Sequence, residues 1–318
     1  MSIENASDTS GPPSEIASPP GGETTSVEPP CAAEPETPPS CPPPLAWQDV
    51  LAEFRNQSET FEFTGSDGLT VRGQVLGEGP PLYILNGLSA TPELFCLAVW
   101  LLREEFRCVV IDYPEEATSL SELASSLFTA ADGLGDREFD LFASSFSSAV
   151  AMEILTNDAS RIRHAVLQGP VNGIRLGFLE RLATRAAMFS PGRMRHIPFF
   201  KAALQNNHRL WFPPFDETRW HFMALNVGSV KISTVAPRLR MLNRLDWTER
   251  LAGIKTPTFI VSSEGDATRH HEAAKLFASQ IPGTKNERIP NCGHVPFVTH
   301  PHRLAKLIGP FLRDEEPA

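Results

Sequence analysis

The chain has 318 residues, of which 41% are hydrophobic, and a formal net charge of −10 at pH 7. This is enough apolar material for one large domain with an additional segment, and the acidic balance argues against a nucleic-acid partner. No apolar stretch approaches the roughly 18 residues that a transmembrane helix needs, so we expect no integral membrane association.

Residues 1–44 contain seven acidic residues, no Lys or Arg, and mostly Pro, Ser, Thr, Glu and Gly. Such a segment cannot bury enough apolar surface to offset its chain entropy, so we expect a disordered, acidic, Pro-rich tail. It carries neither a basic nor an apolar segment typical of a secretory signal. The five cysteines are odd in number and lack metal-ligand spacing, which indicates a reducing compartment and predicts a cytoplasmic location.

Beyond residue 44 the pattern alternates between short apolar strands and amphipathic helices. The predicted strands are residues 61–64, 69–76, 82–85, 107–112, 139–143, 164–168, 256–261 and 287–289, and the predicted helices are residues 45–56, 92–104, 120–132, 146–156, 273–280 and 302–312. Asp67-Gly68 is a strong hairpin turn between the first two strands. The remaining alternation is typical of an α/β fold with a mostly parallel central sheet.

Residues 174–245 interrupt this alternation and read as several amphipathic helices broken by prolines. We therefore predict an α/β core formed by residues 45–173 and 246–318, with residues 174–245 inserted as an all-helical lid. The lid holds twelve basic and three acidic residues, with aromatic side chains between them. Three interpretations remain open: a solvated basic outer face, attraction of an anionic acyl substrate or acidic membrane surface, and electrostatic cover by the acidic tail.

A cluster of small residues, 143–148, separates the strand at 139–143 from the following helix. A serine at a sharp strand-to-helix corner is how a hydrolase presents a nucleophile, and small residues must stand two positions before and after it. Around Ser145 those positions hold Ala143 and Ser147. Ser144 or Ser148 would instead place phenylalanine at the crowded corner, whereas Ser147 remains an alternative nucleophile.

Two further polar residues follow later strands. Asp266 comes after the strand at 256–261, and His294 comes after the strand at 287–289. The carboxyl ends of parallel strands share one edge of the sheet, where ligands bind in open α/β sheets. The chain order Ser145, Asp266, His294 matches the order nucleophile, acid, base of the α/β-hydrolase fold; Glu264 is the alternative acid.

Taken together, these motifs resemble the α/β-hydrolase superfamily from about residue 58 to residue 313. The residues that carry the resemblance are Asp67-Gly68, Asn86-Gly87, the corner 143–148, Gly265-Asp266, Gly293-His294, and the run 254–301. The short loops at 113–117 and 87–91 look similar to the maspardin-like branch of that superfamily.

The resemblance implies a serine hydrolase that cleaves an ester or thioester of a small or medium acyl substrate through an acyl-enzyme intermediate, without a cofactor or metal. Ser145 would be the nucleophile, His294 the general base and Asp266 the residue that orients it. The backbone N–H groups of Leu88 and Phe146 would form the oxyanion hole. The alternative is a catalytically weak interaction protein on this fold, as in the maspardin-like branch.

His300 and His302 lie one residue apart with no third ligand nearby, which argues against a metal site. We expect His270 and His271 to open the helix after the acid loop, on the surface. The oligomeric state cannot be predicted from the sequence.

Overall fold

The computed structural model describes residues 46–212 and 216–315, so the predicted tail at residues 1–44 lies outside the described residues. The described part contains one eight-stranded sheet in the order β1-β2-β4-β3-β5-β6-β7-β8. Its strands are β1 (Glu59–Thr64), β2 (Thr70–Leu76), β3 (Pro81–Leu85), β4 (Arg107–Asp112), β5 (Phe139–Ser144), β6 (Ile162–Gln168), β7 (Thr258–Ser263) and β8 (Lys285–Ile289).

The first two strands form the expected hairpin, in which Thr64 pairs with Thr70 across the Asp67-Gly68 turn. β2 also runs antiparallel to β4. The remaining neighbours in the sheet, in the order β4-β3-β5-β6-β7-β8, are all parallel. β5 and β7 are buried along their whole length. Continuous apolar strands of this kind are expected when helices cover both faces of a parallel sheet. The mostly parallel α/β sheet predicted from the sequence is confirmed.

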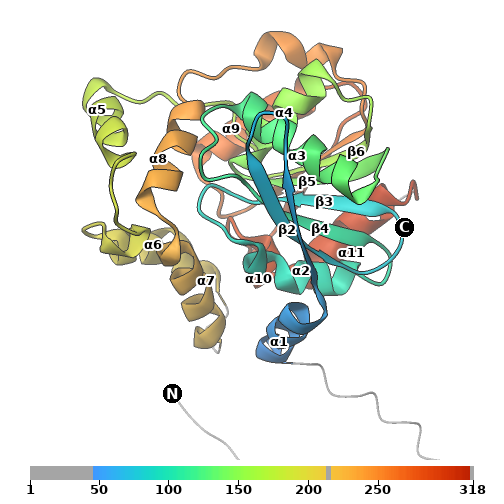
Figure 1. The fold of residues 1–318 in the computed structure, drawn as a ribbon, viewed down its shortest axis with the longest axis horizontal. Coiled ribbons are helices and arrows are strands. Elements are labelled where there is room, and N and C mark those ends of the chain that lie inside the picture. Colours follow the sequence, from blue (N-terminus) through green and yellow to red (C-terminus); the bar gives the residue numbers. More distant parts are fainter. Residues whose placement is uncertain (1–45, 213–215, 316–318) are drawn as a thin grey trace, which may run out of the picture. The chain divides into compact units, whose positions relative to one another are not determined.

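Helices cover the sheet on both sides (Figure 1). One face is covered by α3 (Leu120–Leu134), α4 (Ser147–Asn157) and α9 (Thr268–Gln280), together with the 3-10 segment η4 (Thr248–Gly253). The other face is covered by α1 (Trp47–Gln57), η1 (Pro92–Phe95), α2 (Cys96–Leu102), α10 (Pro296–Thr299) and α11 (Pro301–Leu312). The two apolar layers between these helices and the sheet form the core.

Between β6 and β7, residues 174–212 and 216–245 form a helical insert, drawn in yellow-green to orange at one side of the sheet in Figure 1. Its elements are α5 (Phe178–Ala187), η2 (Met194–His196), α6 (Phe200–His208), η3 (Arg209–Trp211), α7 (Glu217–Ser229) and α8 (Ile232–Met241). Phe212, Trp220 and Met223 of the insert join one of the two core layers. Trp47 of α1 also packs on Phe222 of α7, with ring centroids 5.0 Å apart.

The strand order reverses at the centre of the sheet. β3 leads through α2 to β4 on one side, whereas β5 leads through α4 to β6 on the other, so the order reverses between the neighbouring strands β3 and β5. In open α/β sheets, the carboxyl edge at such a reversal is where ligands bind. Among the described helices, none has both the length and the apolar character needed to cross a membrane.

Candidate functional site

Ser145 occupies the corner between β5 and α4, at the carboxyl edge of the sheet. Its φ angle is 54°, in the left-handed region that a residue with a side chain rarely adopts. The N–H of Ser145 donates to the carbonyl of Gln168 at the end of β6, at 2.8 Å, which ties this conformation to the neighbouring strand. Strained backbone of this kind persists where the surrounding structure enforces it, and it turns the Ser145 side chain out of the sheet.

His294 and Asp266 meet Ser145 at the same edge. The hydroxyl of Ser145 donates to Nε2 of His294 at 2.9 Å, and Nδ1–H of His294 donates to Oδ1 of Asp266 at 2.6 Å. A carboxylate only accepts, so this second bond requires the proton on Nδ1 and leaves Nε2 free as an acceptor. The structure thus joins Ser145, His294 and Asp266, which are up to 149 residues apart in sequence, in one hydrogen-bonded chain.

The Asp266 carboxylate is fully buried but well supplied with donors. Burial raises its pKa, but the hydrogen bond and charge of His294 and the N–H of Ser263, which donates to Oδ2 at 2.7 Å, together hold the pKa below its ordinary value. Glu264 instead accepts the N–H of Asn291 at 2.8 Å on the exposed side of the loop. The structure therefore brings Asp266, and not the alternative Glu264, to the imidazole.

The other serines of the corner are buried and have partners of their own. Ser144 donates to Oε1 of Gln168 at 2.6 Å, Ser147 donates to the carbonyl of Asn86, and Ser148 donates to the carbonyl of Ser145 at 2.6 Å. Of the corner residues 143–148, only Ser145 is partly exposed. A hydroxyl that is both accessible and bonded to an imidazole is the one suited to attack a substrate.

The N–H groups of Leu88 and Phe146 follow β3 and β5, the two neighbouring strands between which the strand order reverses. Within the described residues, neither N–H donates a hydrogen bond to the protein. A Cβ atom added to Gly87 would lie 3.9 Å from the Cβ of Ser145, which shows how closely the first loop approaches the corner. Arg238 of α8, only 6% exposed, donates to the carbonyl of Leu88 at 3.1 Å and so ties this loop to the insert.

Trp211 of the insert lies across the two loops that carry Asp266 and His294. A Cβ atom on Gly265 would overlap the Trp211 ring, and one on Gly293 would lie 2.6 Å from its Cγ. Glycine at both positions is therefore needed for the indole to pack against the backbone beside the hydrogen-bonded chain. These contacts bring the insert directly over this part of the site.

His270 differs from the sequence-based expectation. It was expected on the surface, but α9 begins at Thr268, five residues earlier than predicted, and the ring of His270 is only 4% exposed. Its Nδ1–H donates to the carbonyl of Gly169 at 2.9 Å, and its ring centroid lies 4.4 Å from that of His294. Burial, followed by the charge of His294, lowers the pKa of His270 to about 4, so the ring is neutral at pH 7.

His208, at the end of α6, is a second imidazole near His294 that the sequence did not single out. Burial and then the charge of His294 lower the pKa of His208 to about 4. His300 is adjacent to Thr299 and donates or accepts at its hydroxyl, 3.0 Å away. Across residues 46–212 and 216–315, no group of three His, Cys, Asp or Glu side chains has the arrangement of a metal site.

Residues 82–307 match the family described as the alpha/beta hydrolase family. The chain belongs to the alpha/beta hydrolase family. The match covers every strand from β4 to β8 and all three residues of the hydrogen-bonded chain.

Two curated relatives of this alpha/beta hydrolase are pimeloyl-[acyl-carrier protein] methyl ester esterases. The protein from Aromatoleum aromaticum is 30% identical over 88 residues, which span 28% of this chain and 35% of the relative. The protein from Nitrosospira multiformis is 23% identical over 268 residues, which span 75% of this chain and 96% of the relative. Among solved structures, a thermophilic esterase from Thermogutta terrifontis superposes with a TM-score of 0.68 at 19% identity, covering 81% of this chain and 98% of that one.

Proposed function

We propose that this alpha/beta hydrolase is a serine esterase that cleaves a carboxylic ester or thioester of a small or medium acyl substrate. The observation that carries the proposal is the Ser145 hydroxyl, held on a left-handed corner with its oxygen 2.9 Å from Nε2 of His294. The names of the relatives support ester hydrolysis as the reaction class.

In the proposed mechanism, Nε2 of His294 removes the Ser145 proton as the serine oxygen attacks the acyl carbon. The imidazolium then returns this proton to the leaving alcohol or thiol, which departs and leaves an acyl-serine ester. A water molecule attacks that ester, again losing its proton to His294, and the carboxylic acid is released as Ser145 is restored. Asp266 holds Nδ1–H in place and stabilises the imidazolium in both halves of the reaction.

The negative oxygen that develops on the acyl group needs donors that are already in place. The N–H groups of Leu88 and Phe146 are proposed for this role, because both flank the corner and neither is engaged elsewhere in the described residues. The helical insert is proposed to act as a lid, because Trp211 packs against the loops of Asp266 and His294 and limits the access of water.

The test is hydrolysis of p-nitrophenyl butanoate, with a matched aliphatic thioester as the second substrate. Ser145→Ala should lower kcat on the order of 10⁴-fold or more, and Asp266→Asn roughly 10²- to 10⁴-fold, with thermal unfolding unchanged for Ser145→Ala. A Ser145→Ala protein of full activity would contradict the assignment. A folded wild-type protein that hydrolyses neither substrate would instead favour the interaction-protein alternative.

A further inference from the structure

The helical insert exposes large apolar side chains to an extent that the rest of the described chain does not. Every large hydrophobic residue found exposed in the described residues belongs to the insert: Phe178, Leu179, Leu182, Phe189, Ile197, Phe199, Leu210 and Leu225. Isolated apolar residues on a surface need no explanation, but a concentration of them in one segment marks an interaction site.

The densest group lies on α5 and the turn that follows it. None of the residues of α5 is buried, and Phe178, Leu179 and Leu182 are 73%, 75% and 57% exposed. With about 100° of rotation per residue, these three positions fall within one arc of roughly 100° on the helix. Phe189, 84% exposed, lies two residues beyond the end of the helix. α5 therefore presents one continuous apolar face to solvent.

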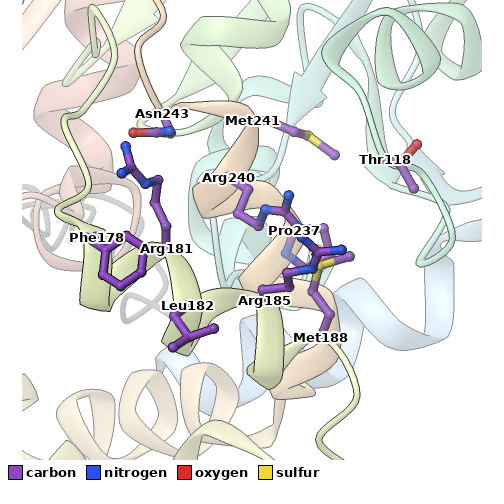
Figure 2. Close-up of a pocket in the computed structure, with 10 residues that line it drawn as sticks. All are labelled: Thr118, Phe178, Arg181, Leu182, Arg185, Met188, Pro237, Arg240, Met241 and Asn243. Atoms are coloured by element: carbon purple, nitrogen blue, oxygen red, sulfur yellow. The ribbon is translucent and has the colours of Figure 1, made fainter.

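Basic side chains border this apolar face. Arg181 and Arg185 of α5 and Arg240 of α8 line a cavity of about 590 Å³ between the two helices. Figure 2 shows Arg185 and Arg240 together beside Met188, while Arg181 extends toward Asn243. Arg240 donates to Sδ of Met188 at 2.9 Å, and none of the three guanidinium groups forms an ion pair with a carboxylate of the described residues. Like charges gathered without a counter-charge favour an anion at this position.

The arginines and the apolar face together favour one class of partner over the others. Guanidinium groups bind phosphate by paired hydrogen bonds, which accounts for the arginines but not for exposed phenylalanine and leucine. A soluble anion would leave the apolar face exposed to water. An acidic protein would cover that face only if it carried an apolar patch of its own. An anionic lipid bilayer offers phosphate groups with apolar chains directly beneath them, so it satisfies both features at once.

We propose that α5 is a peripheral docking element for an anionic lipid bilayer. The α5 surface, as we define it, consists of Phe178, Leu179, Leu182, Phe189, Arg181, Arg185 and Arg240. α5 lies parallel to the membrane plane, its apolar side chains enter the boundary between head groups and acyl chains, and the cavity beside α8 receives a lipid phosphate. Docking of this kind is reversible and is independent of whether the site around Ser145 is active.

The direct test is co-sedimentation of the full chain with vesicles of phosphatidylcholine alone and of phosphatidylcholine mixed with phosphatidylglycerol. Binding should require phosphatidylglycerol and should weaken as salt screens the arginines. Each of Arg181→Gln, Arg185→Gln and Arg240→Gln should weaken binding about fivefold. Leu182→Ser should also weaken binding, and its effect should persist at low salt because it removes apolar contact. All variants are first checked for wild-type thermal unfolding.

The matched control is Lys275→Gln, an exposed lysine of α9 outside the insert, which should bind as the wild type does. A variant that carries all three arginine substitutions and still binds as tightly as the wild type would overturn the proposal. Equal binding of the wild type to vesicles with and without phosphatidylglycerol would also overturn it. Binding to soluble poly-glutamate with no sedimentation on either vesicle would also overturn it, and would point to an acidic protein as the partner.

Discussion

His270 should make the stability of this protein fall steeply in mild acid. Its ring is 4% exposed, and burial together with the charge of His294 lowers its pKa from 6.5 to about 4. The folded-state pKa lies below the unfolded one, so this contribution to stability is fully present above pH 6.5 and is lost as the pH falls through about 4. A difference of about 2.5 pKa units corresponds to roughly 3 kcal/mol in the free energy of unfolding.

The measurement is urea unfolding of the wild type and of His270→Gln at several values between about pH 7 and pH 4. Glutamine can retain a donor toward the carbonyl of Gly169 but cannot titrate. The free energy of unfolding of His270→Gln should therefore fall by roughly 3 kcal/mol less than that of the wild type over this pH window. His164 has a raised pKa, through its hydrogen bond to Asp140, and its opposite contribution is present in both proteins and cancels in the difference.

The matched control for this experiment is His302→Gln, which removes an imidazole from an exposed position on α11. Its curve should run parallel to that of the wild type. Parallel curves for His270→Gln and the wild type would refute the reasoning, because they would mean that the ring beside His294 can be protonated in the folded state without cost.

Two further predictions concern the packing of the site. Ser147→Ala should retain ester hydrolysis while lowering the free energy of unfolding by about 1–2 kcal/mol, because it removes a buried donor to the carbonyl of Asn86. Loss of ester hydrolysis in a folded Ser147→Ala protein would favour Ser147 over Ser145 as the nucleophile. Gly265→Ala should cost about 1–3 kcal/mol in urea unfolding, because the added methyl group meets the Trp211 ring. That cost should shrink in a Trp211→Ala background, and strictly additive costs would contradict the contact.

Much of the core could be predicted from local pattern. The hairpin turn at Asp67-Gly68 and the continuous apolar run of β4 are signals confined to a few residues, and the structure confirms both. Asp266 and His294 could be placed at one sheet edge because parallel strands end at the same edge. The helix α9 begins at Thr268, earlier than predicted. Its start is hard to recognise in the sequence because Ala267, at the N-cap position, has no capping side chain.

The surroundings of the site could not be predicted, because they come from segments far apart in the chain. Trp211 reaches the loops of Gly265 and Gly293 from the insert, and no local pattern specifies which aromatic residue of the insert does so. The two glycines beside Asp266 and His294 were the available signal that something packs closely there. The burial of His270 likewise depends on contact with Gly169 and His294 across the sheet edge.

The central claim is that Ser145 is a nucleophile activated by His294, and covalent labelling tests it most directly. A fluorophosphonate forms a stable bond with a serine only when an adjacent base makes its oxygen reactive. Intact-mass measurement should show one adduct on the wild type, located on Ser145 by peptide mapping, and none on Ser145→Ala. An unlabelled wild-type protein, or an adduct that persists in Ser145→Ala, would contradict the account.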